Sequence, residues 1–389
     1  MLKTNIQIVL ILLSALILMS SNKGKKTSKS TSIREINNCD CDSLWAKKVT
    51  KDFVSALQQT TKSDYSIWKD YKIKDGYYVL NAGKSKDSIH CLGLFNNGEA
   101  ISYKCSKDVP KMLTPLYSYY LNYINRNEEQ SPLFETYKEA PEFSTWMRKN
   151  SVQSAVYMPT SFPKFPFKIP AKTKAQLAVH EAFHIEVTLR YWFTKKGFWP
   201  KWEIQPDRAA VQSCYLENES IIKLIDDEQE FLALTIEALL DKNHKKVLEN
   251  ANQFISRREQ RYKNLAHKKI KLGDDTLGDC RIGEAYMEIE EGIADYGSWV
   301  AMYNIGTASR QDLLKRYRAK QKDRFYLTGC MLLHASALMA NGNDKPIISK
   351  MVNAPSVETG NLFTIFKDQL KEYHTSIMDS EKNNSKIRN

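Results

Sequence analysis

The residues best suited to carry chemistry are the histidines and the glutamate of His180-Glu181-Ala182-Phe183-His184, which follow the pattern H-E-x-x-H. Residues four apart share one face of an α-helix, about 6 Å apart along its axis, so two imidazoles can bind one metal ion. Glu181 would then project beside that face, within reach of a water molecule at the metal. Zinc lowers the pKa of such water to about 7, and a carboxylate that takes its proton leaves a hydroxide nucleophile. The pattern therefore predicts a zinc site that performs hydrolysis.

Chance is a poor explanation of this pattern. With 7 histidines and 45 acidic residues in 389 positions, a random sequence would contain H-[DE]-x-x-H roughly 0.01 times. The structural alternative is a pair of hydrogen-bonded histidines with an unrelated glutamate between them.

A helix has to position the two histidines. Thr173 and Gln176 form a capping-box signature directly after Pro170, and Gly197 is a helix stop signal. We therefore expect one helix over residues 173–192.

Two histidines leave a catalytic zinc one protein ligand short. Residues 291–296, Glu-Gly-Ile-Ala-Asp-Tyr, resemble the E-G-x-A-x-Y element of gluzincin metallopeptidases, whose glutamate is the third zinc ligand. The resemblance, which covers two short motifs, implies that Glu291 completes the site with His180 and His184. It also implies that Asp295 orients a ligating histidine through the other nitrogen of its ring.

The spacing of the two motifs departs from that resemblance. From His184 to Glu291 the chain runs 107 positions, far more than in thermolysin or aminopeptidase relatives. A helical insertion must lie between them, and residues 220–240 and 247–265 both have the periodicity of amphipathic helices.

Other acids lie on the same helical stripe as Glu291. Glu284 and Glu288 share this stripe with Glu291 and Asp295, so Glu288 is the substitute ligand if Glu291 is not one. A solvated acidic face is the alternative for the whole run. Three arginines upstream could neutralise the surplus acids, although a solvated basic face is the interpretation that we favour for them: Arg257, Arg258 and Arg261.

The glycines of this stretch predict a close helix contact. Gly283, Gly292 and Gly297 lie within one helical segment, and each interior glycine costs about 1 kcal/mol relative to alanine. Close approach of another backbone would offset that cost, and we expect the neighbour to be the helix of His180.

A peptidase also needs a donor for the oxyanion that develops on the scissile carbonyl. We favour Tyr326 as this catalytic donor, because it opens an apolar helix that can pack beneath the site. His334, Tyr303 and Tyr296 are further candidates. Core packing with a bonded hydroxyl is the alternative for each tyrosine.

Composition excludes several classes of protein. With 42% hydrophobic and 26% charged residues, the chain can bury a core, so disorder as its overall state is excluded. The net charge is +12, of which six positive charges lie in the first 34 residues. The remaining +6 is too weak a bias to indicate a nucleic-acid partner.

The N-terminus predicts export. Residues 6–19 are apolar and follow Lys3, which suits a signal peptide better than a spanning helix of about 20 residues. The protein is then secreted or extracytoplasmic, in a periplasm or at a cell surface, and its only membrane contact would be this segment if it stays uncleaved. In such a compartment Cys91 and Cys105, which flank the hairpin turn Asn96-Asn97-Gly98, are candidates for a disulfide, with two buried free thiols as the alternative.

The remaining pattern predicts an α+β, predominantly α-helical fold: a zincin-like catalytic domain with a long helical insertion and a small N-terminal α+β region. Local periodicity indicates a helix from Asp42 to Leu57, strands over 77–105, helices over 109–123 and 142–148, and a strand over 154–158. The chain then divides into five parts: 1–21, signal peptide or anchor; 22–34, flexible basic linker; 35–155, α+β region; 156–375, helical metallohydrolase domain; 376–389, polar tail.

The sequence as a whole therefore predicts an exported zinc metallopeptidase that hydrolyses a peptide or protein substrate with Zn²⁺ as its cofactor. The alternative is a non-catalytic extracellular binding protein that retains a relic of a metal site. Glu181 favours the enzyme, because a pure binding site needs no base at that position. The oligomeric state does not follow from the sequence.

Overall fold

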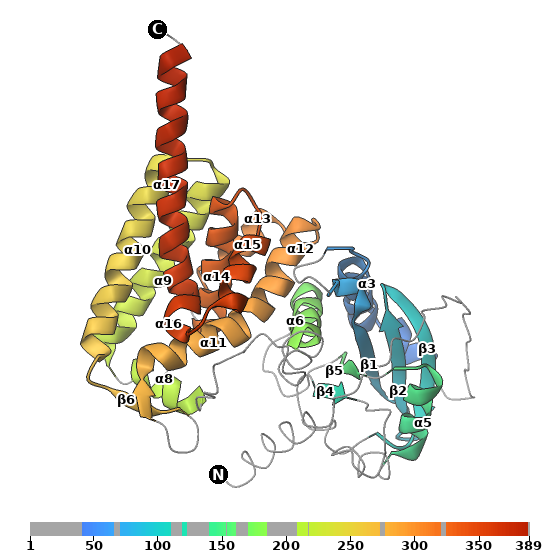
Figure 1. Cartoon of the computed structure of the whole chain (residues 1–389). Coiled ribbons are helices and arrows are strands. Elements are labelled where there is room, and N and C mark those ends of the chain that lie inside the picture. The colour runs from blue at the N-terminus through green and yellow to red at the C-terminus, as the bar shows by residue number, and fades with distance from the viewer. Residues whose placement is uncertain are drawn as a thin grey trace. The chain divides into compact units, whose positions relative to one another are not determined.

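Figure 1 presents the computed structural model of the chain, which describes residues 41–65, 71–109, 119–122, 140–152, 154–160, 170–184, 208–216, 218–272, 277–319 and 324–387. The predicted signal segment and basic linker lie outside the described residues. The chain divides into two compact units: Met1–Phe198 with Asn304–Thr307, and Trp199–Tyr303 with Ala308–Asn389.

The N-terminal unit contains a mixed five-stranded sheet. Its strands are β1 (Tyr77–Lys84), β2 (His90–Asn96), β3 (Glu99–Ser106), β4 (Tyr119–Asn122) and β5 (Ser154–Pro159). They lie in the order β3-β2-β1-β5-β4, with β1 and β5 parallel and the other neighbours antiparallel. The strands predicted over 77–105 and 154–158 are confirmed. The helix predicted over 109–123 is wrong over residues 119–122, which form β4 and pair with β5, and residues 110–118 and 123 lie outside the described residues.

The hairpin of β2 and β3 turns at Asn97 and Gly98, whose φ angles of 53° and 69° are those of a two-residue hairpin turn. Cys91 lies directly opposite Cys105, as predicted, after a register shift near Leu94. The predicted disulfide between them is nevertheless wrong.

Cys91 is bonded to Cys41, with the two Cα atoms 5.5 Å apart, and Cys105 is also in a disulfide. The reason is tertiary, because α2 (Asp42–Ala46) brings Cys41 into a cluster with Ala82 and Cys91. The alternative prediction, that Cys91 and Cys105 are two free thiols, is therefore wrong as well.

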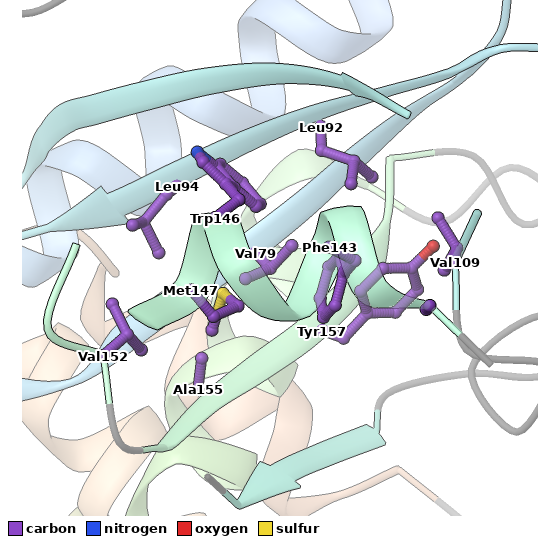
Figure 2. Packing of buried hydrophobic residues seen from close by; sticks show 11 residues of the cluster. Val79, Leu92, Leu94, Val109, Phe143, Trp146, Met147, Val152, Ala155 and Tyr157 are labelled. Carbon is purple, nitrogen blue, oxygen red and sulfur yellow. The ribbon is translucent and has the colours of Figure 1, made fainter. Parts of the chain in front are cut away.

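Helices cover both faces of the sheet. On one face, Phe143, Trp146 and Met147 of α5 (Pro141–Lys149) pack against Val79 of β1 and Leu94 of β2 (Figure 2). This helix confirms the prediction over 142–148. The other face carries α3 (Lys48–Thr61) and α6 (Ala171–Phe183). The predicted helix from Asp42 to Leu57 is present as α2 and α3, which are separated where the backbone of Lys47 is extended.

The packing of α6 is specified by small residues. Ala175, Ala178 and Ala182 are fully buried, which lets α6 approach α3 and the sheet closely. At its ends, Lys174 donates to the Thr160 carbonyl after β5, and the ring of Phe183 packs edge-on against Tyr71. The helix that carries His180 therefore belongs to the unit of the sheet, although the sequence placed a domain boundary near residue 155.

The start of α6 differs from the prediction. The helix begins at Ala171, its N-cap is Pro170, and no side chain caps it. The Pro170 carbonyl accepts the first helical bond from the Lys174 amide, so Thr173 lies inside the helix and cannot act as the cap. The predicted C-terminal part beyond His184 lies outside the described residues.

In the part of the C-terminal unit that the structure describes, the regular structure is helical apart from the short hairpin of β6 (Lys269–Lys271) and β7 (Leu277–Asp279). Its helices are α8 (Arg208–Leu216), α9 (Glu219–Leu240), α10 (His244–Leu265), α11 (Cys280–Asp295), α12 (Ala301–Asn304), α13 (Arg310–Tyr317), α14 (Arg324–Met339), α15 (Lys345–Asn353), α16 (Val357–Gly360) and α17 (Leu362–Ile387). The amphipathic helices predicted over 220–240 and 247–265 are α9 and α10. The predominantly helical α+β fold is thus confirmed.

The polar tail predicted from residue 376 belongs to α17, which continues beyond its buried first turns as far as Ile387 (Figure 1). Leu362, Phe366 and Leu370 anchor the start of this helix. No helix among the described residues is both long and apolar enough to cross a membrane.

Candidate metal centre

The two histidines converge at the C-terminal end of α6. Their Nε2 atoms lie 3.1 Å apart and their ring planes meet at 77°. Nitrogens bound to one tetrahedral zinc at about 2.0–2.1 Å would lie about 3.3 Å apart, so this spacing suits a shared ion. A direct N–H···N hydrogen bond requires a similar spacing. Exposures of 3% for His180 and 5% for His184 mean that a ligand here would be largely removed from water.

Glu181 lies between the two histidines on α6 and is half-buried, unlike its neighbours on either side. A carboxylate in this position keeps access to water beside the imidazole pair. Its carboxylate is therefore accessible to water, and its role as a base stays a prediction.

Glu291 lies on α11, in the C-terminal unit, and is also half-buried. Among the described residues, His180, His184 and Glu291 form a group that could hold a metal ion, with one potential ligand atom from each within 4.8 Å of the others. The three ligands predicted from the sequence are thus those of this group.

Within its own unit, Glu291 has two neighbours. The hydroxyl of Tyr326, on α14, hydrogen-bonds to the Glu291 carboxylate, and Nη1 of Arg208 lies 3.9 Å from Glu291 Oε1. The Arg208 guanidinium also stacks on the Tyr326 ring, 4.7 Å from its centroid. Burial raises the pKa of Tyr326, and the negative charge of Glu291 raises it further, so the hydroxyl stays protonated and can donate.

Arg208 was missed by the sequence analysis. It lies 83 positions before Glu291, and no motif surrounds it. Only the packing of α8 beside α11 brings the two residues together.

Glu288, the substitute ligand, has a different set of contacts. Arg258 donates to both of its carboxylate oxygens, at 3.2 and 2.8 Å. Arg258 also donates to Glu228, and Arg261 donates to Glu228 and Glu284. All five side chains are buried.

In this buried network Arg258 and Arg261 neutralise acids of the α11 stripe, so the solvated basic face favoured from the sequence is wrong for these two residues. Arg257 instead lies at the surface, with its Nε 3.6 Å from Asp227. The structure therefore places Glu288 in an ion-pair network and outside the group that could hold a metal ion.

The network contains three carboxylates and two guanidiniums. Burial raises the pKa of Glu288. The charge of Arg258 lowers this pKa and the charge of Glu284 raises it, and the net result is a raised pKa. Burial also disfavours the charged form of Glu284, but Arg261 and Arg258 hold its pKa below the usual range. Of these two carboxyl groups, Glu288 therefore takes up a proton more readily than Glu284.

Asp295 is the last residue of α11 and accepts a hydrogen bond from Arg316 at 2.8 Å. A short π-helix, Tyr296–Val300, follows it directly, and such turns are frequent at functional sites. The contact with Arg316 was not predicted. The orientation of a histidine by Asp295 stays a prediction.

Three of the four oxyanion candidates form an interior cluster. The ring centroids of Tyr296 and Tyr303 lie 6.2 and 6.4 Å from that of His334. His334 Nδ1 shares a hydrogen bond of 2.7 Å with the Tyr317 hydroxyl, and Tyr296 donates to Asp344. Burial lowers the pKa of His334 to about 3, so this imidazole is neutral. These contacts assign His334 and Tyr296 to the core of the C-terminal unit.

The close approach predicted from the glycines is present, but its partner differs. A Cβ atom on Gly292 would lie 2.5 Å from the Cα of Gly329, and one on Gly329 would overlap the Glu288 carbonyl oxygen. The close neighbour of α11 is therefore α14, and the predicted role of the His180 helix at this contact is wrong. The approach places Tyr326, at the start of α14, beside Glu291.

In comparisons with known proteins, the chain matches no protein-family profile, no curated protein and no solved structure.

Proposed function

We propose that this protein is a zinc metallopeptidase in which His180, His184 and Glu291 bind the metal and Glu181 is the general base. The observation that carries the proposal is the pair of converging, buried imidazoles with a half-buried carboxylate beside them on one helix. A structural pair of histidines would not require that carboxylate.

The donor set supports a catalytic metal over a structural one. Two imidazole nitrogens and one carboxylate oxygen are borderline ligands that suit zinc, and they leave a fourth position for water or substrate. Structural zinc sites are usually closed by four protein ligands, most often with cysteine among them. Among the described residues, the one cysteine outside a disulfide is Cys330, buried in α14.

The chemistry follows from the residues of the chain. Zinc bound here would polarise a peptide carbonyl and lower the pKa of water. Glu181 would take a proton from the attacking water and transfer it to the departing amine. Tyr326 would hold Glu291 in place through their hydrogen bond, a role that its contacts support better than the direct oxyanion donation expected from the sequence.

We also propose that the protein acts outside the cytoplasm. Two disulfides, Cys41–Cys91 and Cys214–Cys280, are compatible with an oxidising compartment. The apolar segment over residues 6–19 supports the same location. The substrate would then be an extracellular peptide or protein.

The test combines metal analysis with the Glu181→Gln variant. We expect purified protein to contain about one zinc per chain, and Glu181→Gln to keep the metal while kcat falls at least about a hundredfold. Glu219→Gln, at an exposed position that begins α9, is the matched control and should change neither.

Unchanged turnover in Glu181→Gln would exclude this residue as the base. Zinc binding without hydrolysis of any peptide by the unaltered protein would favour the alternative of a non-catalytic metal-binding protein.

A further inference from the structure

We propose that a pocket of the C-terminal unit binds peptides that carry an ammonium group and a carboxylate on either side of an apolar side chain. The pocket lies between the end of α10, the start of α11, and α16 with the start of α17, and its volume is about 490 Å³. Sites for small ligands usually have volumes of about 300–1,000 Å³. The pocket is a second site, and its ligand does not depend on the proposed peptidase function.

The pocket lies on the side of α11 away from the proposed metal ligand. Ile282 and Ala285 of α11 line it. Ile282 precedes Glu291 by nine residues, which at about 100° per residue place the two side chains on opposite faces of the helix. A ligand in the pocket is therefore separated from Glu291 by α11 itself.

Two aromatic rings form the floor of the pocket. Tyr262 of α10 is half-buried, Phe363 of α17 is buried, and their rings pack edge-on with centroids 5.8 Å apart. The guanidiniums of Arg258 and Arg261 lie over the Tyr262 ring, 6.0 and 5.1 Å from its centroid.

The buried ion-pair network holds both of these arginines, so it also fixes the ring of Tyr262 before any ligand arrives. A floor that is already ordered lowers the entropic cost of binding. Aromatic rings in this arrangement suit an apolar or aromatic side chain of a ligand.

The rim of the pocket carries both signs of charge in equal number: Lys263, Arg281, Lys367, Glu259, Asp279 and Glu358. Four of these six charges are paired within the protein. Lys367 donates to the Glu259 carboxylate at 3.1 Å. Arg281 donates to Asp279, which also caps α11 by accepting from the Ile282 amide.

The other two charges, Lys263 and Glu358, are exposed and form no ion pair with a described residue. They belong to different walls of the pocket, because Lys263 lies on α10 and Glu358 on α16. A ligand with a single charge would pair with one of them and leave the other unpaired, whereas a dipolar ligand pairs with both.

The separation of the two walls favours a peptide over a single amino acid, whose ammonium and carboxylate groups lie on adjoining carbon atoms. The carboxylate of the peptide would pair with Lys263 and its ammonium group with Glu358. The apolar side chain between them would lie on the rings of Tyr262 and Phe363. The rival explanation is a solvated surface of mixed charge, whose ion pairs contribute little.

The two charges have two possible sources, the free ends of a short peptide or the side chains of a longer one. Gly-Phe-Gly is the probe for the first source and acetyl-Lys-Phe-Glu-amide for the second. Comparison peptides lack one charge each: acetyl-Gly-Phe-Gly and Gly-Phe-Gly-amide, and acetyl-Gln-Phe-Glu-amide and acetyl-Lys-Phe-Gln-amide.

Calorimetry with the zinc-loaded Glu181→Gln protein measures the affinity for the intact peptides. We expect one of the two dipolar peptides to bind with a Kd below about 1 mM, and about threefold to tenfold more tightly than its comparison peptides. The dipolar peptide that shows this preference identifies the source of the charges.

Variants then decide the assignment. Lys263→Gln should lower the affinity for the dipolar peptide to that for the comparison peptide without a carboxylate, and Glu358→Gln to that for the one without an ammonium group. Ala266→Trp, at an exposed position of the rim, should fill the pocket and abolish binding. Lys245→Gln and Glu249→Gln, at exposed positions elsewhere on α10, are the matched controls and should change no affinity.

Equal affinities for dipolar and singly charged peptides would overturn the assignment, as would a preference that survives in both Lys263→Gln and Glu358→Gln. Removal of zinc separates the pocket from the proposed metal centre, and binding should be the same in zinc-loaded and chelator-treated protein. Binding that disappears with the zinc would place the peptide at the metal centre and reject the pocket. Binding in the pocket without hydrolysis of any peptide by the unaltered protein would reject the peptidase proposal alone.

Discussion

At the scale of single residues, Glu291 and Glu288 lie about one helical turn apart on α11 and have different partners. Glu288 is held by two donors of Arg258 inside the buried network, whereas Glu291 is half-buried beside Tyr326 and Arg208. A carboxylate that is already paired in the interior would have to leave an arginine unpaired in order to bind a metal, which costs several kcal/mol. Glu291 is only half-buried and its arginine lies 3.9 Å away, so the same change costs less there.

This difference predicts opposite effects of two matched variants on metal binding. Glu291→Gln should lower zinc affinity by at least about tenfold, because an amide oxygen is a neutral and weaker ligand. Glu288→Gln should keep the metal but lower stability, since it leaves Arg258 short of an acceptor. Competition with a chelator and chemical denaturation measure the two effects. Zinc loss in Glu288→Gln with Glu291→Gln unaffected would reverse the ligand assignment.

At the scale of elements, the position of Tyr326 depends on how closely α14 approaches α11. The contact of Gly292 with Gly329 leaves no room for a side chain on either helix. These two glycines let the backbones meet, and the start of α14 then places the Tyr326 hydroxyl on Glu291.

Gly329→Ala should therefore be strongly destabilising. The added methyl group would overlap the Glu288 carbonyl oxygen, and forced separation of packed helices costs about 1–3 kcal/mol. Ser336→Ala on the same helix is the control, because the buried Ser336 hydroxyl has no hydrogen-bond partner among the described residues. Thermal unfolding should show a lower Tm for Gly329→Ala and an unchanged or higher Tm for Ser336→Ala. Equal Tm values would mean that α14 can shift away at little cost.

At the scale of the whole molecule, stability should depend on pH through the buried core of the C-terminal unit. Burial lowers the pKa of His334 to about 3 from its ordinary value of 6.5. The folded protein then keeps this imidazole neutral, while the unfolded chain binds a proton below pH 6.5. The unfolded state binds more protons in that window, so stability is lost as the pH falls from 6.5 towards 3.

The contribution of one such group has a slope of at most about 1.4 kcal/mol per pH unit. Urea unfolding between pH 7 and pH 4 should therefore be less pH-dependent in His334→Gln than in the unaltered protein. His244→Gln is the control, because His244 is exposed at the start of α10. Parallel pH profiles for His334→Gln and the unaltered protein would contradict the role of His334.

The sequence by itself determined the features that depend on local geometry. The 3.6-residue period of a helix brings His180 and His184 to one face whatever surrounds them, so their convergence could be predicted. The Asn97-Gly98 turn likewise predicted the hairpin, in which a register shift between Leu94 and Phe95 then brings Cys91 opposite Cys105. The long amphipathic helices α9 and α10 followed from the same kind of periodicity.

Tertiary structure alone decided which distant groups meet. The partner of Cys91, the pairing of Arg258 with Glu288 and the place of Arg208 beside Glu291 all join residues far apart in the chain. No local period relates such residues, because their contacts depend on how whole helices pack. The sequence could therefore predict candidate ligands and a base. The packing of α8, α10 and α14 around α11 determined that Glu288 is paired with a buried arginine, whereas Glu291 has a tyrosine and an arginine beside it.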